Sequence, residues 1–236
     1  MTKLTLTSNT TDFTTTLNPP ILLDINKRYE AAFLSLHTYN SVPNITEINN
    51  IFKYSMDKGI TWKTITFDKG AYELVEISSK IKLEIPEIEI DYYKPTFKSI
   101  VVINNENYMI DFGVENSIGK TLGFRNEKLG VGTHQSPNII DIEKVNSILV
   151  HCDIIVGTYV NSSRSNVIYN FTQRVSPGYK VIERPSPELI FLPIVGRPDI
   201  QSIRIWLTDQ DLKPLDLMGE IITIDILIRE INTKNK

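Results

Sequence analysis

Residues 219–230 read GEIITIDILIRE, and this stretch decides the fold class of the chain. Its alternate positions carry isoleucine: Ile222, Ile224, Ile226 and Ile228. Side chains alternate between the two faces of a β-strand, so these isoleucines form one face and Thr223, Asp225 and Arg229 form the other. The stretch is therefore predicted to be a strand with one face in the core and the other in solvent or against a partner.

The rest of the chain continues this pattern of short β-branched runs. The segments 185–194 and 200–209 are bounded by Pro, Gly and Asp, and no helical period competes with them. In 29–39 apolar residues run almost without interruption, which predicts a strand covered on both faces. The strands expected in the sandwich are 11–17, 29–39, 48–56, 148–155, 167–171, 189–192, 203–207 and 221–228. This count and spacing favour an all-β jelly roll or a related Greek-key β-sandwich. An immunoglobulin-like sandwich is the alternative, but no Cys-Trp-Cys spacing supports it.

One part of the chain departs from the all-β pattern. The runs 48–56 and 60–67 are separated by Asp57-Lys-Gly59, which predicts a hairpin. Between 71 and 83 apolar residues recur at three- and four-residue spacing, as they do on an amphipathic helix. This is the one full helix that the sequence predicts.

The segments after this helix complete the expected insertion. The stretch 86–95 is acidic, aromatic and bounded by prolines, and we expect it to be an exposed crossing segment. The runs 97–103 and 108–112 are predicted to form a second hairpin. We therefore expect an α+β insertion at 57–125 that contains one helix. The jelly-roll sandwich then consists of 1–56 and 126–236, with the loop-like stretch 130–137 as the junction.

Composition and charge exclude several classes of protein. The chain has 236 residues, of which 41% are hydrophobic and 22% charged, as in ordinary globular proteins that fold without disulfides or metals. Its formal net charge of −3 provides no basic field for phosphate backbones, so bulk nucleic-acid binding is not expected. Cys152 is the only cysteine, which excludes an intrachain disulfide and predicts a small buried side chain. The sequence has no apolar run of about 18 residues and no apolar N-terminal region, so no membrane span or signal peptide is expected.

One segment resembles a phosphate-binding loop, namely Gly119-Lys-Thr121. A P-loop requires a glycine about five positions before the glycine of the Gly-Lys pair. That position is Val114, and Gly113 lies one residue too early. The segment is therefore predicted to be a structural turn that packs Leu122 and Phe124 into the core.

No catalytic, cofactor or metal site is predicted. His37, His134 and His151 lie in three separate elements, without the spacing of zinc ligands. Asp209 and Asp211 lie at a strand end, where a turn uses aspartate for its own backbone hydrogen bonds. No Gly-x-Ser-x-Gly motif marks a serine nucleophile, so the chain is not expected to be an enzyme.

Four aromatic residues outside the apparent core are candidates for contact with a partner. Tyr92 and Tyr93 lie in the acidic segment that prolines bound, Trp62 lies at a strand start, and Tyr159 follows a Gly-Thr break. Aromatic side chains are enriched at protein interfaces. Partly buried residues at sheet edges are the alternative interpretation.

Several short blocks stand in a distinctive order along the chain. In the C-terminal part they are PGY at 177–179, IRIWLTDQD at 203–211 and GEI at 219–221. Before them stand LTSNTTDF at 6–13, GAYEL at 70–74 and NSIGKTLGF at 116–124. In this order and spacing the blocks resemble the penton, or minor capsid, protein of Polinton/Maverick elements and adintovirus-like viruses, over nearly the whole chain.

The resemblance implies a single jelly roll that forms a homopentamer at the vertices of an icosahedral capsid, beside a double-jelly-roll major capsid protein. It implies a place in the virion, after assembly inside the host cell, and a role in assembly rather than catalysis. The threonine-rich stretch 7–16 is then expected to act as an arm. The alternative is a jelly-roll or lectin-like binding module that recognises carbohydrate or a receptor through exposed loops.

Overall fold

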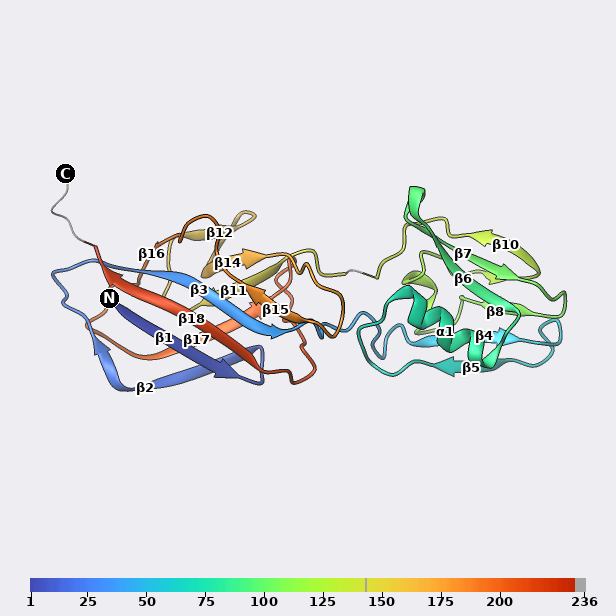
Figure 1. Cartoon of the computed structure of the whole chain (residues 1–236), viewed down its shortest axis with the longest axis horizontal. Helices are drawn as coiled ribbons and strands as arrows, with labels where there is room; N and C mark the ends of the chain where they lie inside the picture. The colour runs from blue at the N-terminus through green and yellow to red at the C-terminus, as the bar shows by residue number, and fades with distance from the viewer. Residues whose placement is uncertain (143, 232–236) are drawn as a thin grey trace. The chain divides into compact units, whose positions relative to one another are not determined.

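The computed structural model describes residues 1–142 and 144–231. The chain divides into two compact units, one made of Met1–Val42 with Val145–Lys236 and the other made of Pro43–Lys144. The first is named the sandwich unit and the second the inserted unit. The first and the last of the described strands both belong to the sandwich unit (Figure 1).

The sandwich unit consists of two antiparallel sheets. Its main strands are β1 (Thr2–Ser8), β2 (Asp12–Leu22), β3 (Tyr29–Tyr39), β11 (Ile148–Cys152), β14 (Val167–Phe171), β15 (Lys180–Glu183), β17 (Asp199–Thr208) and β18 (Ile222–Glu230). One sheet has the order β1-β18-β3-β15 and the other the order β14-β11-β17-β2. Two short strands, β12 (Thr158–Val160) and β13 (Ser163–Ser165), form a separate hairpin, and β16 (Leu192–Pro193) pairs with β3.

This strand order is that of a jelly roll. Numbered along the chain, the first, eighth, third and sixth main strands form one sheet, and the second, seventh, fourth and fifth form the other. Antiparallel strands in this Greek-key order make a jelly-roll sandwich. The fold class expected from the sequence is therefore confirmed.

The core of the sandwich unit lies between the two sheets. The alternation predicted for residues 222–228 is confirmed, because the inward isoleucines of β18 are at most 3% exposed. Burying one such side chain contributes about 1.5–3 kcal/mol. Phe33 of β3 stacks on Tyr169 of β14 with ring centroids 4.4 Å apart, which joins the two sheets. Cys152 is fully buried in the same core, as predicted.

The inserted unit is an α+β unit with its own core. Its elements are β4 (Ile51–Ser55), β5 (Lys63–Thr66), α1 (Leu74–Glu84), β6 (Ile88–Tyr93), η1 (Lys94–Thr96), β7 (Lys98–Ile103), β8 (Met109–Asp111), η2 (Ile118–Lys120), β9 (Lys128–Leu129) and β10 (Gly132–Gln135). The sheets have the orders β5-β4-β8-β9 and β10-β7-β6. The predicted helix is confirmed as α1, which buries Ile77 and Ile81. The backbone N–H of Glu73 donates to the Glu76 carboxylate over 2.8 Å, a contact that stabilises the helix start.

Two expectations about the inserted unit are wrong. The segment 86–95 is not an exposed crossing, because it contains β6, whose Ile88 and Ile90 are buried. The runs 97–103 and 108–112 do not pair with each other. Instead β7 pairs with β6 and β10, whereas β8 pairs with β4 and β9. The second correction comes from pairing between strands, which no local sequence pattern reports, whereas the alternation of Ile88 and Ile90 with acids is a local strand signal that the flanking prolines obscure.

The boundaries between the units differ from those expected. The sequence places the insertion at 57–125, whereas the inserted unit spans 43–144. The strand expected at 48–56 is β4, which pairs with β5 and β8 and is not a sandwich strand. The expected junction at 130–137 contains β10, which pairs with β7. These pairings therefore make the inserted unit longer at both ends than the insertion expected from the sequence.

The sandwich has the expected number of main strands, but two of them differ. β1 and β15 take the places of the expected strands 48–56 and 189–192. The threonine-rich stretch 7–16 is not a free arm, because its two ends belong to β1, paired with β18, and β2, paired with β17. β1 and β15 carry few apolar residues, so their sequence pattern is weak.

Candidate interaction surfaces

Tyr159 lies on the β12–β13 hairpin of the sandwich unit. Its side chain is 63% exposed, and its cross-strand neighbour is Arg164. The hairpin is held by its own ladder and by the Thr158 hydroxyl, which donates to the carbonyl of Ser165 over 2.7 Å. The structure therefore presents Tyr159 to solvent beside a cation.

Trp62 lies in the inserted unit between two lysines. The Nζ atoms of Lys53 and Lys128 are 5.2 Å and 5.1 Å from its ring centroid. Lys53 of β4, Asp111 of β8 and Lys128 of β9 form one cross-strand row, because each pairs with the next. Cations at this distance attract the face of an indole ring. Trp62 is only partly exposed and has intramolecular partners, as the edge interpretation expects.

Tyr92 and Tyr93 end β6 at the turn that leads into β7. Tyr93 is exposed, whereas Tyr92 is partly buried and lies 6.5 Å from the ring of Phe97. Phe97 is also exposed, and its φ of 54° is left-handed, which is strained for a bulky residue. Phe97 is not among the predicted contact residues, since in the sequence only the nearby Pro95 marks a turn.

The four predicted aromatic residues are divided between the two units. Tyr159 belongs to the sandwich unit, whereas the other three belong to the inserted unit. Within the inserted unit, Trp62 lies beside the sheet that contains β4, and the two tyrosines lie on the other sheet. Their use as contacts with a partner therefore stays a prediction for each residue separately.

A column of stacked side chains on the sandwich unit was not predicted. Asp12 accepts two hydrogen bonds from Arg204, at 2.8 Å and 2.6 Å, and the Arg204 guanidinium lies 5.0 Å from the ring centroid of Trp206. Trp206 in turn stacks on His151, with centroids 4.9 Å apart. Burial lowers the pKa of His151 to about 4. The period-two pattern around Trp206 could have placed it on one face with Arg204, but it could not place His151 there.

The Gly119-Lys-Thr121 segment forms a packing turn, as predicted. Leu122 and Phe124 are buried in the core of the inserted unit. A Cβ atom at Gly119 would lie 2.7 Å from the Cβ of Phe112, so the glycine lets the turn pack closely against that ring. The residue serves packing in this fold.

Asp209 and Cys152 also have structural roles. Among the described residues, no group of three or more His, Cys, Asp and Glu side chains is placed to hold a metal ion. Asp209 accepts hydrogen bonds from the backbone N–H groups of Asp211 and Lys213, which confirms the predicted turn. Burial raises the pKa of Cys152 to about 12, so this thiol stays protonated at neutral pH.

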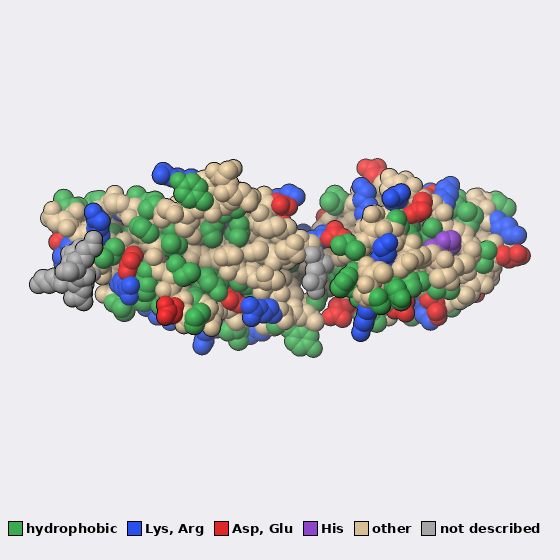
Figure 2. Space-filling view, turned by 90° about the horizontal axis from the view of Figure 1, so that it is seen from above, with side chains coloured by type: hydrophobic (Ala, Val, Ile, Leu, Met, Phe, Trp, Pro, Cys, Tyr) green, Lys and Arg blue, Asp and Glu red, His purple; other side chains and the backbone are tan. Residues whose placement is uncertain are grey.

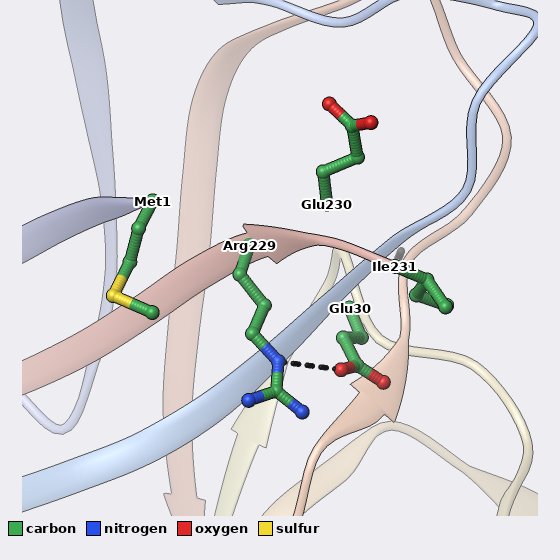
Figure 3. Close-up of a pocket in the computed structure, with 5 residues that line it drawn as sticks. All are labelled: Met1, Glu30, Arg229, Glu230 and Ile231. Carbon is green, nitrogen blue, oxygen red and sulfur yellow. Dashed lines mark hydrogen bonds and ion pairs between the residues drawn. The ribbon is translucent and has the colours of Figure 1, made fainter. Parts of the chain in front are cut away.

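An open pocket of about 580 Å³ lies at one end of the sandwich unit (Figure 3). The described residues that line it are Met1, Glu30, Arg229, Glu230 and Ile231. Arg229 donates to Glu30 over 2.6 Å, and its guanidinium lies 3.3 Å from the ring centroid of Phe191. These contacts hold the arginine in an ion pair with Glu30.

Charged side chains of both signs are interspersed over the face that Figure 2 shows. No single-sign field dominates that face, in keeping with the small net charge. In the described part of the chain, no helix is sufficiently long and apolar to cross a membrane.

Comparisons with known proteins identify the fold. No protein-family model matches the chain, and no curated protein matches it. The crystal structure of the mavirus penton protein is similar to this chain with a TM-score of 0.51 and 14% sequence identity, over 97% of this chain and 99% of that chain. The resemblance to penton proteins is therefore confirmed for the fold. The D1-D2-D3 domains of the flagellar cap protein FliD from Escherichia coli match with a TM-score of 0.15, at 11% identity over 99% of this chain and 56% of that chain, which carries no argument.

Proposed function

We propose that this protein is a penton subunit, a structural capsid protein that forms homopentamers at the vertices of an icosahedral capsid. The observation that carries the proposal is the fold shared with the mavirus penton protein over 97% of this chain and 99% of that chain. A likeness of that extent includes the inserted unit as well as the jelly roll. The order of the sequence blocks supports the same role independently.

The shape of the sandwich unit suits a closed ring. A ring of identical subunits uses a heterologous contact, in which one surface of each copy meets a different surface of the next. β1 and β2 end their sheets on one flank of the sandwich, and β14 and β15 end them on the other. Two unlike flanks on one unit meet the requirement for such a contact.

In this role the protein acts by assembly and not by catalysis, and it uses no cofactor. Its partners are four further copies of itself and a double-jelly-roll major capsid protein around the vertex. Its place is the virion, at the capsid vertex, after assembly inside the host cell.

Light scattering on a sizing column tests the proposal, over a range of protein and salt concentrations. We expect a species of five times 26.9 kDa. A monomer at every concentration would contradict the homopentamer. Co-sedimentation with the major capsid protein then tests the second partner, with the heat-unfolded protein as the control.

A carbohydrate- or receptor-binding module is the second candidate function. The observation that favours it is the half-exposed pair of Arg204 and Asp12 beside Trp206 on a sheet face, because these groups can donate and accept hydrogen bonds to sugar hydroxyls. Glycan-array binding by a monomer, lost in Trp206→Ala and kept in Trp62→Ala, would favour this function over the penton.

A further inference from the structure

The β12–β13 hairpin is an incomplete element. Each strand has three residues, and in the described part of the chain the hairpin joins neither sheet of the sandwich. A two-stranded hairpin alone is marginally stable in water. Its exposed pair, Tyr159 and Arg164, consists of residue types that dominate the energetic centres of interfaces. These features indicate a hairpin that a partner completes.

The flank that carries β2 has a long edge strand with little protection. Among the described strands, β2 pairs only with β17, so one of its backbone edges has no strand partner. Natural edge strands avoid further pairing through lysine, proline or short length. In β2 the prolines, Pro19 and Pro20, lie in the C-terminal half, and residues 12–17 (DFTTTL) contain neither lysine nor proline. The N-terminal half of β2 is thus open to another strand.

The two surfaces lie on opposite flanks of the same sandwich. The hairpin lies beside β14, whereas β2 ends the other side of that sheet (Figure 1). Tyr169 of β14 donates a hydrogen bond to Glu183 of β15 over 2.8 Å, so these two strands share the hairpin's flank. When one flank of each copy meets the opposite flank of the next, the same head-to-tail contact repeats from copy to copy. A closed ring requires a contact of this kind.

The charges of the two surfaces are also complementary. Residues 157–166, which include the hairpin, carry Arg164 and no acid, whereas β2 carries Asp12 and no base. The Asp12 side chain is 53% exposed although it pairs with Arg204. Each of its carboxylate oxygens has lone pairs for a further donor. A second guanidinium can therefore approach Asp12 from the open edge.

We propose that the β12–β13 hairpin of each copy lies against residues 12–17 of β2 in the next copy. The inference rests on the proposed function, since it assigns the surfaces that close the penton ring. Tyr159 and Arg164 supply one side of the contact, and Asp12, Thr14 and Thr16 supply the other. The partner is a second copy of this chain because both surfaces belong to it and their charges, Arg164 on one and Asp12 on the other, are opposite.

Covalent crosslinking tests the contact. Tyr159→Cys is combined in one chain with Thr14→Cys or, in a second variant, with Thr16→Cys, and each protein is treated with a short bismaleimide. All three positions are exposed, and Cys152 is fully buried, so the wild-type chain supplies the background. We expect a ladder of covalent species that ends at five copies for at least one of the two double variants.

Matched controls separate this contact from others. The variant Tyr159→Cys with Tyr179→Cys places both thiols toward the hairpin's flank and is expected to give no ladder. Each single variant is likewise expected to stay uncrosslinked between copies. A covalent dimer from Tyr159→Cys alone would assign a contact between two hairpins and overturn the inference.

Light scattering on the same samples distinguishes the two proposals. Pentamers without a ladder from either double variant would overturn the hairpin contact and leave the penton function in place. A monomer at every concentration would overturn both. Thermal unfolding of each variant verifies that the substitutions leave the fold intact.

Discussion

The two units of this protein close their folds in different ways. The sandwich unit joins the two ends of the described chain, because β1 pairs with β18 from Thr2↔Ile228 to Ser8↔Ile222. The inserted unit pairs its strands only within 43–144. Contacts between distant residues slow folding, because loop closure must precede them. One unit is therefore built from pairings within a continuous segment, whereas the other pairs strands from distant parts of the chain.

The two units also have separate hydrophobic cores, and each contains its own tryptophan as a fluorescence probe. One hydrophobic cluster includes Phe33 and the isoleucines of β18, and the other includes Phe112 and the buried residues of α1. Each unit contains one tryptophan, Trp206 in the sandwich unit and Trp62 in the inserted unit. Tryptophan fluorescence can therefore follow each unit alone.

The largest expected effect comes from removing one core ring in either unit. Phe33→Ala and Phe112→Ala each delete a side chain that is 1% exposed, and each is expected to lower the free energy of unfolding by about 3–5 kcal/mol. In a Trp62→Phe background, denaturant unfolding followed by Trp206 should shift for Phe33→Ala only.

The reciprocal background completes this test. With Trp206→Phe, fluorescence of Trp62 should shift for Phe112→Ala only. Equal shifts at both reporters for either variant would show one cooperative unit and break the comparison.

Overpacking a tight contact in the inserted unit is expected to lower the free energy of unfolding by less than the removal of a core ring. Gly119→Ala would place a Cβ atom 2.7 Å from the Cβ of Phe112, and overpacking of this kind costs about 1–3 kcal/mol. We expect the transition reported by Trp62 to move and the one reported by Trp206 to stay. Gly130→Ala is the matched control, since a Cβ atom there has no neighbour within 4 Å.

The sandwich unit has a carboxylate whose loss should have a smaller, pH-dependent effect. Burial tends to raise the pKa of Asp225, but hydrogen bonds from Thr5, Lys3 and Ser35 lower it overall below 3.8. Asp225→Asn is expected to cost about 1–2 kcal/mol at pH 7.

The sign of the pH dependence follows from that lowered pKa. The ionised carboxylate stabilises the fold fully above the unfolded pKa, and this stabilisation is lost as the pH falls through the lowered folded value. Urea unfolding followed by Trp206 between pH 7 and pH 2 should therefore show the two proteins converge in acid. A constant difference across that range would contradict the assignment.

The smallest effect concerns a carboxylate in the β4–β5 turn of the inserted unit. Hydrogen bonds from the hydroxyl and backbone of Thr61 and from Ser55 lower the pKa of Asp57 to about 2. In Thr61→Val the pKa should rise toward 3.8. Carboxyl chemical shifts measured by NMR follow this titration, and an unchanged midpoint would show that the hydroxyl does not hold the carboxylate.

Much of the fold could be predicted because its signals are local. The alternation in β18 and the three- and four-residue spacing in α1 depend on neighbours along the chain, and both predictions are confirmed. β6 was misjudged because prolines and acids around Ile88 and Ile90 resemble a loop. β1 and β15 are not among the predicted sandwich strands because each carries only two apolar residues, Leu4 and Leu6 in β1 and Val181 and Ile182 in β15.

The candidate surfaces were predictable only in part. Tyr159 and Tyr93 lie outside the core, as expected, and are exposed, whereas their use as contacts with a partner stays a prediction. The partners of Trp62 come from β4 and β9, and the column under Trp206 joins β2, β17 and β11. Sequence spacing does not report which strands lie side by side, so these contacts required the fold.

The sequence by itself determined which face of each strand or helix is apolar, because side chains follow the local period of the backbone. The number and spacing of its strands favoured a jelly-roll or related Greek-key sandwich, and the resemblance to penton proteins implied the single jelly roll. Only the tertiary structure decided which strands pair, and hence that β4 belongs to the inserted unit and that β1 closes on β18. The physical reason is that a β-ladder joins backbone groups irrespective of side chain, so packing of the whole chain selects among possible partners.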